Sequence, residues 1–342
     1  MTSGMKREYY PVIDVCKFIF AIMIVLMHAD LLDQNINVAY RLQITVFALI
    51  VPYFFVSSGF FIGSKNGNDF NKNLNNIIKS GKRYIRLYLI FGGWYFFINL
   101  LKTAILDHDL IHSILPSLHK LLVETPGGGI WFVYTLIWCV GILFFCYKTH
   151  NPDKSILISA IFCFFLFLFG AFLFAKPFND SFIRKAYDKV LLSEHNVLFY
   201  GIYFFVGYLV GLKCFVKNEI KLLRLLMGMI VVTYIIYGLF FYDWNNVLTS
   251  VFFSLFKLVA TLSIFVLALH FKSKTPQTNF IRKMSTVIYF THWNIIYVEI
   301  LLKNLVSINQ QILAFICAIA SVCFSFVLIK SFHGEIYKKL FG

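Results

Sequence analysis

Charge is scarce in this chain. Asp, Glu, Lys and Arg together make up 14% of its 342 residues, whereas hydrophobic residues make up 59% and aromatic residues 19%. A soluble protein of this length would leave too much of that apolar surface in contact with water. No loop between the apolar runs is long enough to hold a second core. The composition therefore excludes a soluble fold and predicts one membrane-embedded domain over residues 1–342.

Other features are missing as well. The seven cysteines form no CxxC pair, and none lies in a loop where it would join a disulfide framework. We interpret them as small buried apolar residues. No internal repeat of 20–50 residues and no low-complexity linker is visible. The first apolar run carries Asp14 and Lys17 and lacks a small-residue cleavage site, so it does not fit a cleavable signal peptide.

Long hydrophobic runs are the dominant feature that is present. Windows of about 19 residues predict ten transmembrane helices, so the expected fold is an all-α, polytopic membrane helix bundle. The predicted spans cover residues 11–30, 44–63, 84–106, 130–147, 155–175, 197–213, 222–242, 250–271, 285–303 and 308–330.

The basic residues indicate how the bundle is oriented. The chain has a net charge of +15, and Lys and Arg gather between spans two and three, six and seven, and eight and nine, and at both chain ends. By the positive-inside rule, both termini are then expected on the cytoplasmic side of the cell membrane. Topology and contact with anionic lipids explain the positive charge, so no nucleic-acid partner is expected.

The first predicted span carries three ionisable residues on one face. Lys17 and His28 are eleven residues apart, which corresponds to a rise of ~16 Å and a net rotation of only ~20° along a helix. Asp14 precedes Lys17 by one turn and lies on roughly the same side. Ionisable groups are costly inside a bilayer and are rarely kept there without a function. The arrangement favours chemistry over lipid contact.

Two arginines mark the start of the third span. Arg83 and Arg86 are three residues apart on one helix face, and paired guanidinium groups suit the binding of phosphate. Topology and lipid headgroup binding explain the same pattern, so both interpretations stay open.

A second polar group lies in the ninth span. Ser285, Tyr289 and His292 fall within two helical turns, and a histidine at this depth is a functional candidate. It is also explained by a hydrogen bond to a neighbouring helix.

Lys257, in the middle of span eight, needs a carboxylate, a water-filled cavity or a path to the surface. Asp243 and Glu299 are both possible partners, and the sequence does not choose between them.

Two further segments carry motifs, one at the start of the fourth span and one between the third and fourth spans. Residues 125–133 contain three consecutive glycines before Trp131. They predict either a flexible turn with an interfacial anchor or a backbone that approaches a substrate closely. Residues 107–122 predict an amphipathic element on the outer membrane surface. There His108 and His112 have a spacing compatible with a metal, but no further ligands are visible, so no metal is expected.

Taken in order, these motifs resemble acyltransferase family 3, a family of integral-membrane acyltransferases that use acyl-CoA. The resemblance covers nearly the whole chain and is strongest around Asp14, Lys17 and His28, although many members have Arg in place of Lys17. The other matching segments are Ser58–Gly59–Phe60, the basic run at 82–87, Trp131–Phe132, the glycine-spaced run at 201–211 and the Ser…Tyr…His series at 285–292.

The resemblance implies transfer of an acyl group, with acetyl favoured, from cytoplasmic acyl-CoA to a hydroxyl of a cell-surface or lipid-linked carbohydrate. His28 is then the general base or the acyl carrier, and Asp14 is expected to orient Lys17. Lys17, Arg83 and Arg86 are expected to bind the coenzyme A phosphates. Contacts to the thioester or the acceptor are expected from Ser58, Trp131, Tyr289 and His292.

Two other classes remain open at this stage. A secondary transporter or flippase, acting on a polar solute or a lipid-linked glycan, also uses intramembrane Asp, Lys and His residues. No inverted repeat and no paired broken helices support that class. The second alternative is a non-catalytic partner subunit. The sequence does not predict an oligomeric state.

Overall fold

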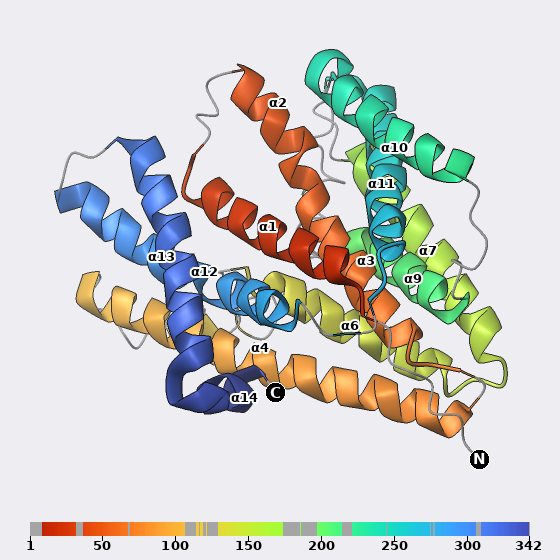
Figure 1. The fold of residues 1–342 in the computed structure, drawn as a ribbon, viewed down its shortest axis with the longest axis horizontal. Coiled ribbons are helices and arrows are strands. Elements are labelled where there is room, and N and C mark those ends of the chain that lie inside the picture. Colours follow the sequence, from red (N-terminus) through yellow and green to blue (C-terminus); the bar gives the residue numbers. More distant parts are fainter. Residues whose placement is uncertain are drawn as a thin grey trace.

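The computed structural model describes residues 9–31, 37–67, 69–106, 129–173, 197–213, 221–243, 245–273, 278–305 and 309–341, with a few single positions between them. This described part is an all-α bundle, as predicted (Figure 1). Its β structure is limited to one isolated bridge, between Tyr9 and Ser273.

Helices occupy all ten predicted spans. In chain order they are α1 (Pro11–His28), α2 (Asn37–Thr45), α3 (Ile50–Gly63), α4 (Phe70–Leu106), α6 (Trp131–Cys146), α7 (Pro152–Leu173), α9 (Val197–Lys213), α10 (Lys221–Ile236) with a π-helical turn (Tyr237–Phe241), α11 (Val247–Leu269), α12 (Asn279–Leu305), α13 (Gln310–Lys330) and the short α14 (Glu335–Phe341).

Many of these helices are apolar enough to cross a membrane by themselves. Among the described residues, six helical stretches have the length and composition of a membrane span, in α1, α2–α3, α7, α10, α11 and α13. Shorter apolar helices lie in α6 and α9. The chain is therefore a multi-pass membrane protein, in which the more polar α4 and α12 occupy the third and ninth predicted spans.

Three boundaries differ from the prediction. The second span is divided into α2, a 3-10 turn at Phe47–Leu49, and α3. Helix α4 begins at Phe70 rather than at residue 84, and α12 begins at Asn279 rather than at residue 285. Hydropathy detects only the apolar part of a helix, whereas backbone hydrogen bonding continues through polar turns outside the bilayer.

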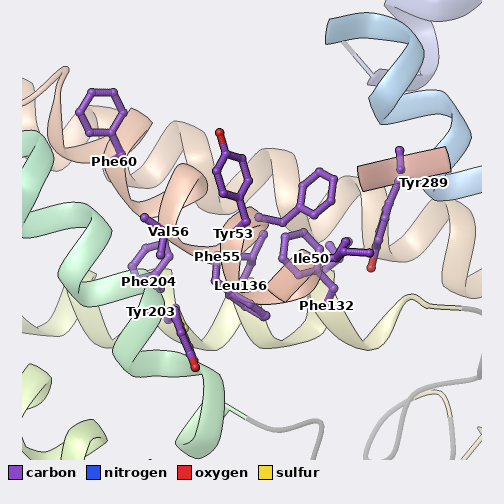
Figure 2. Close-up of a cluster of buried hydrophobic side chains, with 14 of the residues drawn as sticks. Ile50, Tyr53, Phe55, Val56, Phe60, Phe132, Leu136, Tyr203, Phe204 and Tyr289 are labelled. Carbon is purple, nitrogen blue, oxygen red and sulfur yellow. The ribbon is translucent and has the colours of Figure 1, made fainter. Parts of the chain in front are cut away.

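Helices α3 and α9 cross at unusually close range because glycines face backbone on both sides. A Cβ atom on Gly59 would overlap the carbonyl oxygen of Phe204, and one on Gly207 would overlap that of Val56. Gly63 and Gly211 make the same approach one turn further along. Val56 and Phe204 lie side by side at this crossing (Figure 2). Small residues allow such packing between membrane helices, where apolar surface by itself does not select a neighbour.

Helix α1 lies inside the bundle, packed against α12, α13, α3 and α11 (Figure 1). Tyr9, just before α1, exchanges two backbone hydrogen bonds of 3.0 and 2.9 Å with Ser273, which precedes α12. At the far end, Gln310 at the start of α13 donates to the carbonyl of Ala29 (2.9 Å). Helices α1 and α12 therefore begin at the same end of the bundle, and α13 runs back towards that end.

The C-terminal helix α14 closes the same end. Phe341 is buried, with its ring 5.4 Å from that of Phe91 and 5.7 Å from that of Phe290. The ammonium group of Lys283, near the start of α12, lies 5.1 Å from the ring centre of Tyr337. Both ends of the described chain therefore lie where α1 and α12 begin.

Candidate active site

Asp14 and Lys17 lie in the first turns of α1, at the end of the bundle just described. Asp14 is buried, and its Oδ2 accepts a hydrogen bond of 2.6 Å from the hydroxyl of Thr278, directly before α12. Lys17 is half-buried, with its Nζ 4.9 Å from the ring centre of Phe61. Asp14 also interacts electrostatically with Lys17, which compensates part of the cost of burying each charge.

Two arginines from other helices complete a group that we call the cation cluster: Lys17, Arg83 and Arg282. Both guanidinium groups lie close enough to act electrostatically on Lys17. Arg282 also acts on Asp14 and donates to Oδ1 of Asn279 (2.6 Å). Burial raises the pKa of the Tyr337 hydroxyl, against the opposing effect of Arg83 and Arg282. Helices α1, α4, α12 and α14 therefore meet around concentrated positive charge.

Two other predicted site residues lie close to this cluster in the fold: Arg86, expected to bind the coenzyme A phosphates, and Ser58, expected to contact the thioester or the acceptor. Arg86 is exposed on α4, one turn beyond Arg83. Ser58 is half-buried on α3 and shares a hydrogen bond with the hydroxyl of Tyr84, the neighbour of Arg83. The structure therefore places Ser58 on the side of the bundle that carries the cations.

His28, at the end of α1, faces α12. Its ring stacks on that of His292 with a centroid distance of 5.6 Å and an interplanar angle of 20°. It also lies 4.9 Å from the ring of Trp293. We call His28, His292 and Trp293 the imidazole cluster. Two sequence-predicted residues that are 264 positions apart thus become neighbours, and the structure adds a tryptophan that sequence reasoning did not single out.

The tautomer of His292 follows from its hydrogen bond. The ring is fully buried, and Nδ1 lies 2.6 Å from the carbonyl oxygen of Tyr289. A carbonyl oxygen only accepts, so Nδ1 carries the hydrogen and the Nε2 of the neutral ring presents a lone pair. Within the described residues, this buried Nε2 has no hydrogen-bond partner, and neither has the buried Nε1 of Trp293. The Nε2 acceptor of His292 and the Nε1 donor of the next residue, Trp293, are therefore both left without a described hydrogen bond.

Gly129 brings backbone against both groups. Its φ of +71° is a left-handed conformation that glycine adopts without steric cost. A Cβ there would lie 3.4 Å from Cε1 of His292 and 3.6 Å from Nε1 of Trp293. The Tyr289 hydroxyl donates to the Gly129 carbonyl at 2.5 Å. At this glycine the backbone therefore lies close to two side chains of α12, and its close approach to a substrate stays a prediction.

Trp131, at the start of α6, lies further towards α9. Its ring is 5.3 Å from that of Tyr200 and 6.3 Å from that of Phe55. The next residue, Phe132, lies nearer to α12, with its ring 5.3 Å from that of Tyr289 (Figure 2). Of the expected substrate contacts, His292 therefore adjoins His28 and Tyr289 adjoins His292, whereas no contact of Ser58 or Trp131 with this pair is seen among the described residues.

The remaining polar candidates give no second site. The Nζ of Lys257 lies 5.6 Å from the ring centre of Phe199. Asp243, one of its two possible partners, is exposed and accepts hydrogen bonds from Asn245. The side chain of Glu299, and both His108 and His112, lie outside the described residues.

Sequence reasoning missed Thr278, Arg282 and Trp293 as site residues. One signal was present: the same fourteen-residue interval separates Asp14 from His28 and Thr278 from His292. On two parallel helices, equal intervals bring both pairs together. The sequence does not show that α1 and α12 are parallel neighbours, so the two equal intervals could not be interpreted from the sequence.

The described residues thus form a multi-pass helix bundle with a stacked imidazole pair and a separate group of cations. Residues 10–330 match the acyltransferase domain of acyltransferase family 3, so the chain belongs to this family of membrane acyltransferases. The match spans every residue of both clusters. No curated protein and no solved structure matches the chain.

Proposed function

We propose that the protein is a membrane O-acyltransferase. It moves an acyl group, with acetyl favoured, from cytoplasmic acyl-CoA to a hydroxyl of a cell-surface or lipid-linked carbohydrate. One observation carries the proposal: His28 faces α12 inside the bundle, while the cation cluster surrounds Lys17 on the same helix. The two residues are ~16 Å apart along the helix axis. Membership of this family of membrane acyltransferases supports the acyl-transfer reaction.

The donor would bind at the cation cluster. Coenzyme A is strongly anionic at its nucleotide end, and guanidinium groups bind phosphate with bidentate geometry. Lys17, Arg83 and Arg282 supply this charge, and exposed Arg86 adds to it one turn away. By the positive-inside rule, this end and both termini would face the cytoplasm. The long, flexible pantetheine arm would then carry the thioester along α1 towards His28.

His28 would act as general base. It takes the proton of the acceptor hydroxyl as the oxygen attacks the thioester carbonyl. The new C–O bond forms, the C–S bond breaks, and the coenzyme A thiolate takes the proton back from His28. A variant of this route has His28 carry the acyl group between donor and acceptor.

Asp14 acts on the donor side of this scheme. It lies ~21 Å from His28 along the helix axis, too far to orient the imidazole. Held by Thr278, it fixes the Lys17 end of the site instead. His292, which adjoins His28, and Tyr289, which adjoins His292, would contact the thioester or the acceptor directly, whereas Ser58 and Trp131 would line the approaches to His28.

The test measures transfer of labelled acetyl from acetyl-CoA to membrane carbohydrate. His28→Ala should lower the rate by at least ~10²-fold, the usual contribution of a general base. His150→Ala, in an exposed turn after α6, is the matched control and should keep the parental rate. Parental transfer by His28→Ala would refute the catalytic assignment. Uptake of an unmodified solute, without transfer, would favour the transporter alternative.

A further inference from the structure

The indole of Trp293 is a buried donor that the fold does not use. Its Nε1 is shielded from solvent and has no hydrogen-bond partner among the described residues. Tryptophan N–H groups usually find a partner when they are buried, because an unpaired buried donor costs free energy. An unpaired donor beside His28, the proposed general base, therefore indicates a functional role for Trp293.

The unused donor points into the imidazole cluster. The indole ring lies 4.9 Å from the ring of His28, with an interplanar angle of 44°. Nε1 also lies 3.6 Å from the point that a Cβ on Gly129 would occupy, and the same point is 3.4 Å from Cε1 of His292. The indole N–H therefore lies close to the Gly129 backbone and to the ring of His292, and the indole ring adjoins His28.

The other polar groups of the cluster do not offer an equivalent donor. The Tyr289 hydroxyl is committed to the carbonyl of Gly129. His292 uses its N–H on the carbonyl of Tyr289, and its free Nε2 is an acceptor. His28 takes the acceptor proton on the nitrogen that carries its lone pair. Among the groups of this cluster whose hydrogen bonds are described, the indole N–H is thus the donor left for a developing negative charge.

We propose that Trp293 is a catalytic residue whose indole N–H stabilises the oxyanion of the acyl-transfer intermediate. The inference rests on the proposed function. As the acceptor oxygen bonds to the thioester carbon and its proton moves to His28, the carbonyl π electrons move to oxygen. The indole N–H donates to that oxyanion. When the carbonyl re-forms, the C–S bond breaks, and the thiolate leaves with the proton from His28. His292, with its lone pair, faces the acceptor hydroxyl.

The test replaces the N–H and keeps the ring. Trp293→Phe should lower kcat by about 100-fold, the usual loss for one oxyanion donor, and leave the KM for acetyl-CoA within about twofold. Trp138→Phe is the matched control. Trp138 is exposed on α6, so this variant should keep the parental kcat.

A second variant separates chemistry from folding. Benzothienylalanine at position 293 keeps the bicyclic shape and replaces only the N–H by sulfur, so it should reproduce the loss in kcat. Rates are expressed per folded protein, measured by size-exclusion chromatography in detergent. Parental kcat in either variant, while His28→Ala is inactive, overturns the inference and leaves the proposed function intact. If His28→Ala also keeps the parental rate, the proposed function itself fails.

Discussion

His28 and His292 occupy equivalent positions on two parallel helices, with their rings stacked 5.6 Å apart. Fourteen residues earlier, Asp14 and Thr278 occupy the preceding equivalent positions and share a hydrogen bond of 2.6 Å. Both helices rise by ~1.5 Å per residue, so α1 and α12 stay in register over ~21 Å. The hydrogen bond at one end and the stacked imidazoles at the other tie the donor end and the proposed reaction centre into one unit.

The lone pair of His292 should matter for turnover. His292→Leu removes the Nε2 acceptor, and we expect kcat to fall by roughly 10- to 100-fold, the equivalent of about 1–3 kcal/mol. His292→Gln can place an amide group near the position of Nε2 and should retain more activity than the leucine variant. Steady-state kinetics in native membranes measure both. Equal, parental kcat values would show that His292 only fills space.

The Asp14–Thr278 contact should stabilise the fold and order the donor end. Thr278→Val leaves the buried carboxylate without its hydroxyl donor, which should lower the free energy of unfolding by about 1–3 kcal/mol. The KM for acyl-CoA should rise in the same variant. Thermal unfolding in detergent measures the first effect, and Thr278→Ser should reverse both.

Thr286→Val serves as the control for this contact. Thr286 bonds only the Arg282 carbonyl of its own helix, so its loss should change little. The interpretation of Asp14 is wrong if Thr278→Val and Thr286→Val behave alike.

The cation cluster should govern donor affinity and leave the chemical step unchanged. Arg83→Gln and Arg282→Gln should each raise the KM for acyl-CoA about tenfold, equivalent to about 1.4 kcal/mol, with little change in kcat. Added salt should weaken donor binding in the parent more than in these variants, because exposed charges are screened. Lys154→Gln removes an exposed cation on α7 and should leave KM unaltered. An equal effect of all three substitutions would indicate general surface charge, not a binding site.

The α3–α9 crossing should tolerate no added methyl group. In Gly207→Ala the new Cβ meets the backbone of Val56, which cannot rotate away, and overpacking of this kind costs about 1–3 kcal/mol. Gly228→Ala is the matched control, since a Cβ there meets nothing within 4 Å and alanine favours a helix. Midpoints of thermal unfolding compare the two. A Gly207→Ala protein as stable as the parent would contradict the close crossing.

Local sequence properties predicted much of the architecture. Each of the ten apolar runs is helical in the structure, because the bilayer requires every backbone group to be satisfied within its own segment. Helices α4 and α12 begin before the spans that hydropathy predicts. Hydropathy detects only the part of a helix inside the bilayer, whereas polar helical turns continue outside it. The placement of Asp14, Lys17 and His28 on one helix face likewise followed from spacing.

Which helices became neighbours was decided only by the tertiary structure. Lipid is as apolar as leucine, so hydrophobicity does not select a partner for a membrane helix; close glycine contacts and buried hydrogen bonds do. Helix α12 lies parallel to α1 and in register with it, tied by the Asp14–Thr278 hydrogen bond, which brought His292 and Trp293 to His28 and brought Thr278 and Arg282 to Asp14 and Lys17. The sequence by itself determined a membrane helix bundle with ionisable groups along one helix, because those features depend on residues near each other in the chain. Pairing across more than 260 residues depends on packing, and packing made those groups a site.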